Sequence, residues 1–390
     1  MVKNINFFVF TYNIYGNNKS LIGIKDLIFK KYNKNSPINN NLDIIVIHLQ
    51  EVDMNKKEQL HKFLNKEIEN KGEFKLVNKY YACNTLFSKL TSFGIYSFIY
   101  YNVSSFKNNI SLPISNLIHY ECRIPRNRKI IGGKTSNILI GTKGHVIIEL
   151  KITNQTFYFV SCHCDYKNKK TSIDIYNKLY KLLQKKITSK TAPIFIAGDI
   201  NDRPILFKNK DNQQILNINF KKGPNCSEDK FNNEKNKSDI DSYCSFLRKI
   251  NKTFPTKKNI SRYKKNIKDL SKKQFSNKHF QLLGFNEGVN NKGVDFFPTC
   301  HYKKGVLNIG KYLDNKMSKN KKVTKYVKTK KIKKIYFDGK NIGHPDRIFY
   351  KGKNIKCHYY SSILDTDTKY LKGYIYSDHL PVMGIYTIHY

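Results

Sequence analysis

The sequence alternates short apolar runs of strand length with connectors rich in lysine and asparagine. Most of these runs are apolar at nearly every position, which is typical of strands buried on both faces. They predict strands at residues 7–15, 42–49, 94–101, 145–152, 156–162, 192–197, 347–350 and 381–388. Apolar residues at helical spacing predict helices over 55–68 and 173–187. This strand–helix–strand order predicts a layered α/β fold.

Two stretches interrupt the pattern. Residues 208–278 are rich in Lys, Asn and Ser, and residues 316–334 contain dense runs of lysine. Both compositions are typical of solvated insertions. We therefore expect a single domain over residues 1–390 with Lys/Asn-rich insertions at about 208–278 and 316–334.

The chain carries 71 Lys+Arg against 29 Asp+Glu, a formal net charge of +42 at pH 7. Such a charge attracts nucleic acid, anionic lipid or polyphosphate ligands. Because the lysines crowd nearly every connector and do not follow one helix face, most of the charge is read as compositional bias. The charge therefore does not choose among these partners.

No apolar run approaches the ~20 residues that a bilayer-spanning helix needs, and the N-terminal segment lacks the pattern of a signal peptide. The 8 cysteines are too few for a disulfide scaffold. Cys162-His163-Cys164 has no second Cys/His pair at zinc-finger spacing, so we expect reduced, mostly buried cysteines. The expectation is an intracellular, cytoplasmic protein, with peripheral contact to an anionic membrane as an option.

Acidic residues are scarce, so their positions are informative. Four of them end an apolar run or stand beside a His or Arg, namely Glu51, Asp199, Asp346 and Asp378. Similar positions are held by Asn13, His163, Asn201 and His379. One carboxylate at a strand end is usually a turn or a helix cap, but a set of this size favours a functional cleft.

The chemistry that this set supports is metal-assisted attack of water on phosphorus. Carboxylate oxygens suit Mg²⁺, a further Asp can orient the water, and Asn and His donors stabilise charge on the phosphoryl oxygens. No glycine-rich phosphate loop and no Gly-x-Ser-x-Gly turn occurs. These absences disfavour nucleotide-driven phosphoryl transfer and a serine hydrolase.

These residues stand in motifs that resemble those of the endonuclease/exonuclease/phosphatase superfamily. In family order, the segments are Thr11-Tyr12-Asn13-Ile14 (T-x-N-[VI]), Leu49-Gln50-Glu51 (Q-E), Gly198-Asp199-Ile200-Asn201-Asp202-Arg203 (G-D-[LI]-N-x-R) and Ser377-Asp378-His379-Leu380-Pro381-Val382 (S-D-H-x-P-V). They span nearly the whole chain. Each segment alone would be a weak signal, but together they are a strong one.

Further segments resemble the inositol polyphosphate 5-phosphatases within that superfamily. They are Gly141-Thr142-Lys143-Gly144-His145-Val146 (G-N-K-G-x-V), Phe285-Asn286-Glu287-Gly288 (F-x-E-G), Phe296-Phe297-Pro298-Thr299-Cys300-His301-Tyr302 (F-x-P-T-Y-K-Y) and Asp346-Arg347-Ile348 with the residues that follow (D-R-I). The resemblance implies a four-layer α/β sandwich of two mixed β-sheets flanked by helices. It also implies that residues 1–390 form one catalytic domain.

The resemblance implies a role for each matching residue. Glu51 would bind Mg²⁺, with Asn13 and Asp378 near the metal. Asp199 would orient and activate the attacking water. The scissile phosphate would be held by Asn201, by His163, and from the opposite side by His379, whose tautomer is set by Asp346.

The same resemblance implies substrate contacts. Lys143 and Tyr302 would bind neighbouring ring phosphates. His301 stands where the family has lysine, and Cys300 where it has tyrosine. A neutral histidine binds a phosphate dianion more weakly than a fixed cation, so recognition of the 4-phosphate is left open. Arg203 is a substrate-binding candidate, with an ion pair within the fold as the alternative.

We therefore expect an Mg²⁺-dependent phosphatase that hydrolyses a phosphate monoester of a phosphoinositide or inositol polyphosphate and acts as a monomer. One alternative is a nuclease or other phosphodiesterase of the same superfamily, since the charge suits nucleic acid. The basic stretches lack the interleaved aromatic residues of base-stacking surfaces, which disfavours it. Another alternative is a catalytically dead module that docks on anionic membranes.

Overall fold

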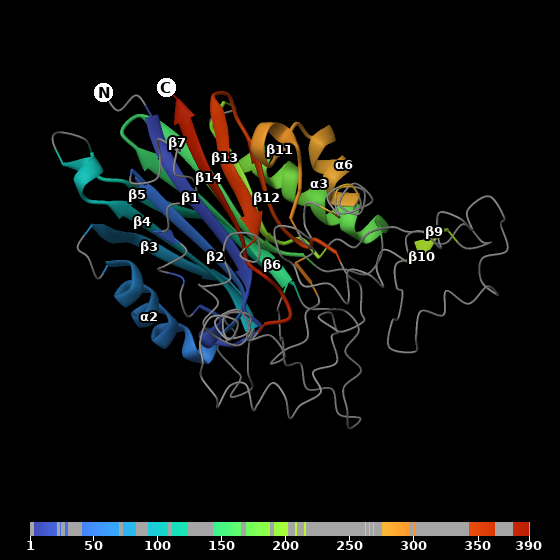
Figure 1. The fold of residues 1–390 in the computed structure, drawn as a ribbon, viewed down its shortest axis with the longest axis horizontal. Helices are drawn as coiled ribbons and strands as arrows, with labels where there is room; N and C mark the ends of the chain where they lie inside the picture. Colours follow the sequence, from blue (N-terminus) through green and yellow to red (C-terminus); the bar gives the residue numbers. More distant parts are fainter. Residues whose placement is uncertain are drawn as a thin grey trace.

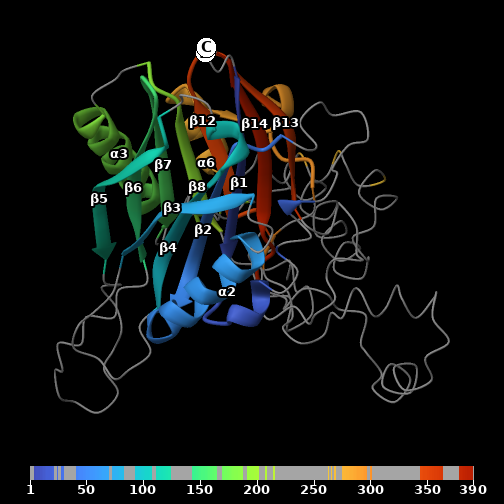
Figure 2. The same ribbon diagram turned by 90° about the vertical axis from the view of Figure 1, so that its left-hand side faces the viewer.

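The computed structural model describes residues 4–21, 24, 28–29, 41–69, 73–82, 93–107, 111–123, 143–164, 169–187, 191–201, 207–208, 214–215, 262, 265, 268, 275–296, 299–300, 343–362 and 377–389. In these residues, two six-stranded sheets pack against each other (Figures 1 and 2).

The first sheet has the strand order β13-β14-β1-β2-β4-β3. Its strands are β1 (Asn4–Asn13), β2 (Ile44–Asp53), β3 (Phe74–Ala82), β4 (Phe93–Asn102), β13 (Ile355–Ser362) and β14 (Val382–His389). Strand β1 pairs in parallel with β2, and in antiparallel fashion with the C-terminal strand β14. The N-terminal strand therefore lies beside the C-terminal one (Figure 1).

The second sheet has the order β11-β12-β8-β7-β6-β5. Its strands are β5 (Ile114–Arg123), β6 (Lys143–Ile152), β7 (Gln155–His163), β8 (Ile194–Asp199), β11 (Asn286–Glu287) and β12 (Asp346–Lys351). Strands β7 and β8 are parallel, and the other pairs are antiparallel. Each sheet is therefore mixed.

Helices cover the outer faces of the two sheets (Figure 2). The longer ones are α2 (Lys57–Glu69), α3 (Lys169–Lys186) and α6 (Phe275–Leu282). Short elements are the 3₁₀ turns η1 (Asn18–Leu21), η2 (Met54–Lys56), η3 (Ser104–Phe106) and η6 (Val289–Asn291), and the strand pair β9 (Phe207–Lys208) and β10 (Gln214–Ile215). Helix α2 packs Leu60 and Leu64 against the first sheet, and α3 packs Leu179 and Leu183 against the second.

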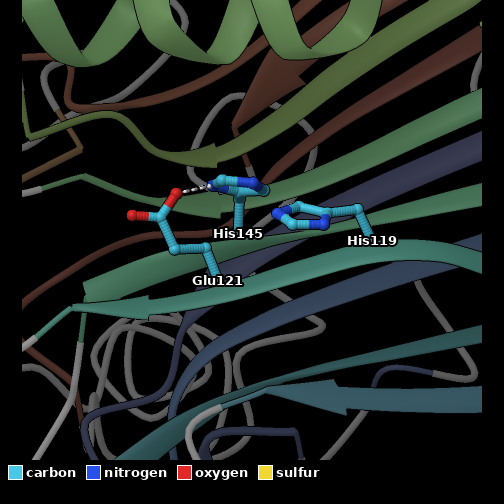
Figure 3. Close-up of side chains that lie close together, drawn as sticks. All are labelled: His119, Glu121 and His145. Atoms are coloured by element: carbon cyan, nitrogen blue, oxygen red, sulfur yellow. Dashed lines mark ion pairs between the residues drawn. The ribbon is translucent and has the colours of Figure 1, made fainter. Parts of the chain in front are cut away.

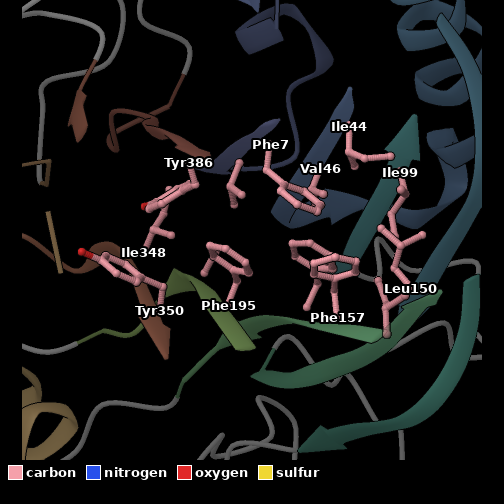
Figure 4. Close-up of a cluster of buried hydrophobic side chains, with 14 of the residues drawn as sticks. Phe7, Ile44, Val46, Ile99, Leu150, Phe157, Phe195, Ile348, Tyr350 and Tyr386 are labelled. Carbon is pink, nitrogen blue, oxygen red and sulfur yellow. The ribbon is translucent and has the colours of Figure 1, made fainter. Parts of the chain in front are cut away.

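The main core lies between the two sheets (Figure 4). Phe7 of β1 meets Phe157 and Phe195 of the second sheet there, at ring-centroid distances of 5.0 and 6.1 Å. Phe8, the next residue along β1, belongs to the core on the α2 side. Successive side chains of a strand point to opposite faces, so the central strands are apolar on both. The observed layers confirm the predicted four-layer α/β sandwich.

The strands predicted from continuous apolar runs correspond to β1, β2, β4, β6, β7, β8, β12 and β14, and the predicted helices to α2 and α3. Strands β3, β5 and β13 and the two-residue strands β9, β10 and β11 were not predicted. The first three lie at a sheet edge, where polar residues interrupt the apolar pattern.

Most of the two predicted insertions lies outside the described residues, as does much of what would test the single-domain prediction. Helix α6 begins at Phe275, within the approximate range of the first insertion. Its Phe280 packs on Phe349 of β12, at a centroid distance of 4.4 Å. None of the helices in the described ranges is long and apolar enough to cross a membrane.

Candidate active site

Polar side chains gather where the parallel strands of both sheets end. Asn13 is the last residue of β1, and Glu51 lies near the end of β2. In the second sheet, His163 ends β7 and Asp199 ends β8 directly opposite it. The antiparallel strand β12 begins at this edge, and pairs Asp346 with Asp199. The sheet pairing thus brings together groups that are far apart in the sequence.

Asp199 lies at the centre of the site and is almost fully buried. Its Oδ2 accepts a hydrogen bond from Asn13 Nδ2 at 3.0 Å, lies 3.3 Å from His163 Nε2 and lies 3.9 Å from His379 Nε2. Its Oδ1 accepts the backbone N–H of Asn201 at 2.9 Å. One carboxylate therefore connects residues of both sheets.

Glu51 and Lys143 form the part of the site that reaches solvent. Their side chains are 19% and 17% exposed, and Glu51 Oε1 lies 4.0 Å from Lys143 Nζ. Glu51 Oε1 is also 3.6 Å from His163 Nε2, which Lys143 Nζ contacts as well. Glu51 has a φ of 52°, and the pairing of β2 with β4 is irregular between Leu49 and Val52. Such bulges re-aim side chains, and here the bulge holds the Glu51 backbone in an uncommon conformation.

His379 is held by the segment before β14. Its Nδ1 lies 2.8 Å from Asp346 Oδ2, so this nitrogen carries the proton that Asp346 accepts. Ser377 Oγ donates to the Asn13 carbonyl at 2.5 Å and accepts the His379 backbone N–H at 3.1 Å. The imidazole therefore presents Nε2 toward Asp199.

Three titratable groups of the site have shifted pKa values. Burial would raise the pKa of Asp199, but the charges of His379 and His163 outweigh burial and hold that pKa well below its usual range. Burial would lower the pKa of His379, but the Asp346 carboxylate raises it well above its usual range. Burial raises the pKa of Asp346 to about 6, although His379 opposes that change. At neutral pH, Asp199 is therefore ionised and His379 is protonated.

The G-D-x-N segment requires its residue types on steric grounds. Gly198 has a φ of 154°, and a Cβ there would lie 1.9 Å from the Cys162 carbonyl oxygen. Strands β7 and β8 therefore approach closely only because residue 198 is glycine. Asn201 has a φ of 56°, which asparagine tolerates well, and its Nδ2 donates to the Cys164 carbonyl at 3.0 Å.

Several predicted site residues are thus found together, namely Asn13, Glu51, Lys143, His163, Asp199, Asn201, Asp346 and His379. Asp378 precedes His379 in the same segment and is half-buried. Arg203, His301 and Tyr302 lie outside the described residues, so their substrate contacts stay predictions. His48 is buried in β2 with Nδ1 2.9 Å from Ser97 Oγ, so His48 is a core residue.

Two residues of the site were not assigned a role from the sequence. Cys300 Sγ lies 3.4 Å from His379 Nε2, and Ser377 connects β1 to His379. Both stand inside motifs that resemble the family, and that position was the available signal. Reduced, mostly buried cysteines were expected, and Cys162, Cys164, Cys300 and Cys357 are buried without a disulfide bond.

The oxygen atoms of the site fit a hard divalent cation. Glu51 Oε1 and Asp199 Oδ2 both lie within 3.6 Å of His163 Nε2, so the two carboxylates face one region. Glu51 is partly exposed, which leaves room for the waters that Mg²⁺ retains. Asp199, Asp346 and His379 also place potential ligand atoms within 4.8 Å of one another. His379 Nδ1 is already hydrogen-bonded to Asp346. We therefore interpret Asp199, Asp346 and His379 as a series of ion pairs and not as a set of metal ligands.

The family assignment rests on residues 10–274, which match the model of endonuclease/exonuclease/phosphatase family 2. The chain therefore belongs to the endonuclease/exonuclease/phosphatase family. No curated protein sequence matches it.

Solved structures with the same fold include two different kinds of protein. One is the inositol polyphosphate 5-phosphatase domain of SPsynaptojanin in complex with inositol (1,4)-bisphosphate and calcium ion, with a TM-score of 0.52 and 17% identity over 99% of this chain and 84% of that one. Another is Cimex nitrophorin in a ferrous NO complex, with a TM-score of 0.50 and 14% identity over 100% of both chains. These likenesses support the α/β sandwich alone, and function has to be argued from the site.

Proposed function

We propose that the protein is an Mg²⁺-dependent phosphatase that hydrolyses a phosphate monoester of a phosphoinositide or an inositol polyphosphate. The observation that carries the proposal is the buried carboxylate of Asp199, with His163 and His379 within 3.9 Å of its Oδ2. An anion orients water through its hydrogen bonds, and the basic groups around it match the charge of a phosphoryl group.

Each residue of the site has its own role in the proposed reaction. Glu51 and Asp199 would hold the cation, which would polarise a phosphoryl oxygen and acidify a bound water. Asp199 orients the attacking water in line with the leaving oxygen. His379 donates from Nε2 to a phosphoryl oxygen, and Asp346 keeps it protonated. Lys143, which contacts both Glu51 and His163, adds a positive charge at the open edge.

The inositol phosphate substrate is supported by two lines of reasoning. The Asp346-Arg347-Ile348 and Gly141–Val146 segments resemble those of the 5-phosphatases, and a 5-phosphatase domain has the same fold. That domain was solved with an inositol bisphosphate. Cytoplasmic location, monomeric state and peripheral contact with anionic membranes, all expected from the sequence, belong to this proposal.

The deciding experiment measures phosphate release with Mg²⁺ from phosphatidylinositol 4,5-bisphosphate vesicles and from soluble inositol trisphosphate. A nicked DNA duplex is incubated in parallel. We expect phosphate release that EDTA stops and that Asp199→Asn abolishes, with the variant still folded. Glu58→Gln is the matched control, because Glu58 is an exposed carboxylate on α2 that pairs with Lys79.

Each arm separates one alternative. DNA cleavage without phosphate release would replace the phosphatase with a nuclease. Vesicle binding without either reaction would indicate a membrane-docking module. An active and folded Asp199→Asn variant would remove Asp199 from the mechanism.

A further inference from the structure

A second group of potential metal ligands lies on β5 and β6. It consists of His119 and Glu121 on β5 and His145 on β6 (Figure 3). Each residue offers one ligand atom, and these atoms all lie within 4.8 Å of one another. We call these three residues the His–Glu–His cluster.

The pairing of β5 with β6 creates the cluster. His145 lies directly opposite Glu121, and His119 precedes Glu121 by two residues and so emerges on the same face. The register of the pair shifts between Leu117 and His119. Without that shift, Tyr120 would lie opposite His145 and both β5 ligands would point to the other face. The bulge therefore decides that the three side chains meet.

The cluster and the Asp199 site lie on opposite faces of the second sheet. Along β6, Val146 and Ile148 belong to the core between the sheets, whereas Ile147 belongs to the core under α3. His145 shares the face of Ile147 by the alternation of side chains. His163 shares the face of Phe159, which lies between the sheets. A ligand of the cluster is therefore separate from the proposed Mg²⁺ region.

Geometry and access suit a bound ion. Glu121 Oε2 lies 3.9 Å from His145 Nδ1, and the rings of His119 and His145 are 5.4 Å apart. The His145 side chain is 8% exposed and that of Glu121 is 36% exposed. The cluster thus has a buried side that orients one imidazole and an open side that admits water.

We propose that the His–Glu–His cluster binds a divalent transition metal of the zinc class. Two imidazoles and one carboxylate with an open position for water are a ligand set that Zn²⁺ takes, whereas Mg²⁺ prefers oxygen ligands only. Zn²⁺ bonds of about 2.0–2.2 Å require ligand atoms about 3–3.5 Å apart, which small side-chain rotations on the edge strand β5 supply. The bound ion ties β5 to β6.

Equilibrium dialysis against Zn²⁺ with excess Mg²⁺ tests the proposal. We expect the wild-type protein to bind one more Zn²⁺ per chain than His119→Ala or His145→Ala. Glu121→Gln should lower the affinity for that additional Zn²⁺ at least about tenfold, since even changes to residues that only support metal ligands cost 10- to 100-fold in affinity. His61→Ala should bind as the wild type does, because His61 lies 3.7 Å from Glu58 but in no three-ligand group of the described residues.

A second readout covers variants that fold poorly. Zn²⁺ should raise the thermal midpoint of the wild type and of His61→Ala by mass action, and raise that of Glu121→Gln less at the same Zn²⁺ concentration. Glu121 is more exposed than His145, so its replacement leaves the buried side of the cluster intact. Equal Zn²⁺ stoichiometry and affinity in the wild type, His119→Ala and Glu121→Gln would overturn the proposal, whatever the enzymatic activity.

Discussion

Asp346 and Arg347 are neighbours in β12, and both side chains are fully buried, but their charges are balanced in different ways. Arg347 makes a two-pronged ion pair with Glu287, which is also buried and accepts a hydrogen bond from Tyr360 Oη at 2.7 Å. Asp346 pairs with His379, and through it leads to Asp199 and the partly exposed Glu51 and Lys143. The Arg347–Glu287 pair therefore lies inside the protein, whereas the Asp346–His379 pair is connected to solvent through Glu51 and Lys143.

Burial of a charged side chain does not by itself indicate a functional site. A buried ion pair whose partners match is costly to break, yet it does no chemistry if no substrate can reach it. The Asp346–His379 pair differs, because His379 also lies near Asp199 and the site opens to solvent at Glu51 and Lys143. Shifted pKa values together with access are the features that indicate an active site.

Of the changes to these two buried ion pairs, Asp346→Asn should reduce kcat most. The amide cannot stabilise the protonated His379 ring as the carboxylate does, so we expect a loss of about 10³- to 10⁴-fold, by analogy with other imidazole–carboxylate pairs. Steady-state phosphate release measures it. The prediction rests on the proposed function. The free energy of unfolding, measured with denaturant, should change much less than the activation free energy. A large loss of stability with unchanged kcat per folded molecule would make Asp346 structural.

Arg347→Met should instead lower the stability of the protein far more than its activity per folded molecule. Removing the guanidinium leaves the Glu287 carboxylate buried without its cation, which should lower the free energy of unfolding by about 3–5 kcal/mol. Urea or guanidinium unfolding measures this loss. Adding Glu287→Gln, which still accepts from Tyr360, should recover part of it. If activity falls far more than the folded fraction, Arg347 contributes to the site and the distinction fails.

The His379 charge should appear in the pH dependence of stability. Its pKa is raised in the folded protein, so its contribution is fully present below the unfolded-state pKa of about 6.5 and is lost as pH rises through the folded-state pKa. The wild type should therefore lose stability above about pH 6.5 relative to the double variant Asp346→Asn/His379→Gln.

Denaturant unfolding over a pH series measures this difference, and the exposed His389→Gln provides the control. The double variant removes both partners, so that no unpaired Asp346 adds its own titration. Parallel stability curves for the wild type and the double variant would show that His379 is not held protonated.

Cys300→Ser should have the smallest effect. The thiol is a weak hydrogen-bonding group beside His379 Nε2, and a serine hydroxyl can occupy the same position, so we expect kcat to change by less than about tenfold. The same phosphate assay measures it. A loss as large as that of Asp346→Asn would place Cys300 in the catalytic machinery.

The central strands could be predicted from the sequence because each is packed on both faces. β1, β2, β7 and β8 are continuously apolar, and their ends supply Asn13, Glu51, His163 and Asp199. The edge strands β3, β5 and β13 were missed, since a strand with an exposed side needs no apolar pattern. The His–Glu–His cluster on β5 was missed for the same reason.

The ordered motifs also predicted most of the described site, but as separate segments. Their contacts join residues far apart in the chain: Asn13 and Asp199 are separated by 186 positions, and Cys300 and His379 by 79. Nothing local in either segment shows that these atoms lie within 3.4 Å. The chemistry of Asp199 could be proposed from its motif, whereas its low pKa depends on neighbours from other segments.

The layered α/β fold, the strand ends that carry polar groups and the residue types available for chemistry follow from local periodicity and steric need along the chain. The packing of the two sheets decided that Asp346 faces the site while Arg347 closes an internal ion pair. It also decided that the bulge in β5 brings His119 and Glu121 to His145. Sheet register sets both outcomes, and register depends on the packing of faces that no single segment contains.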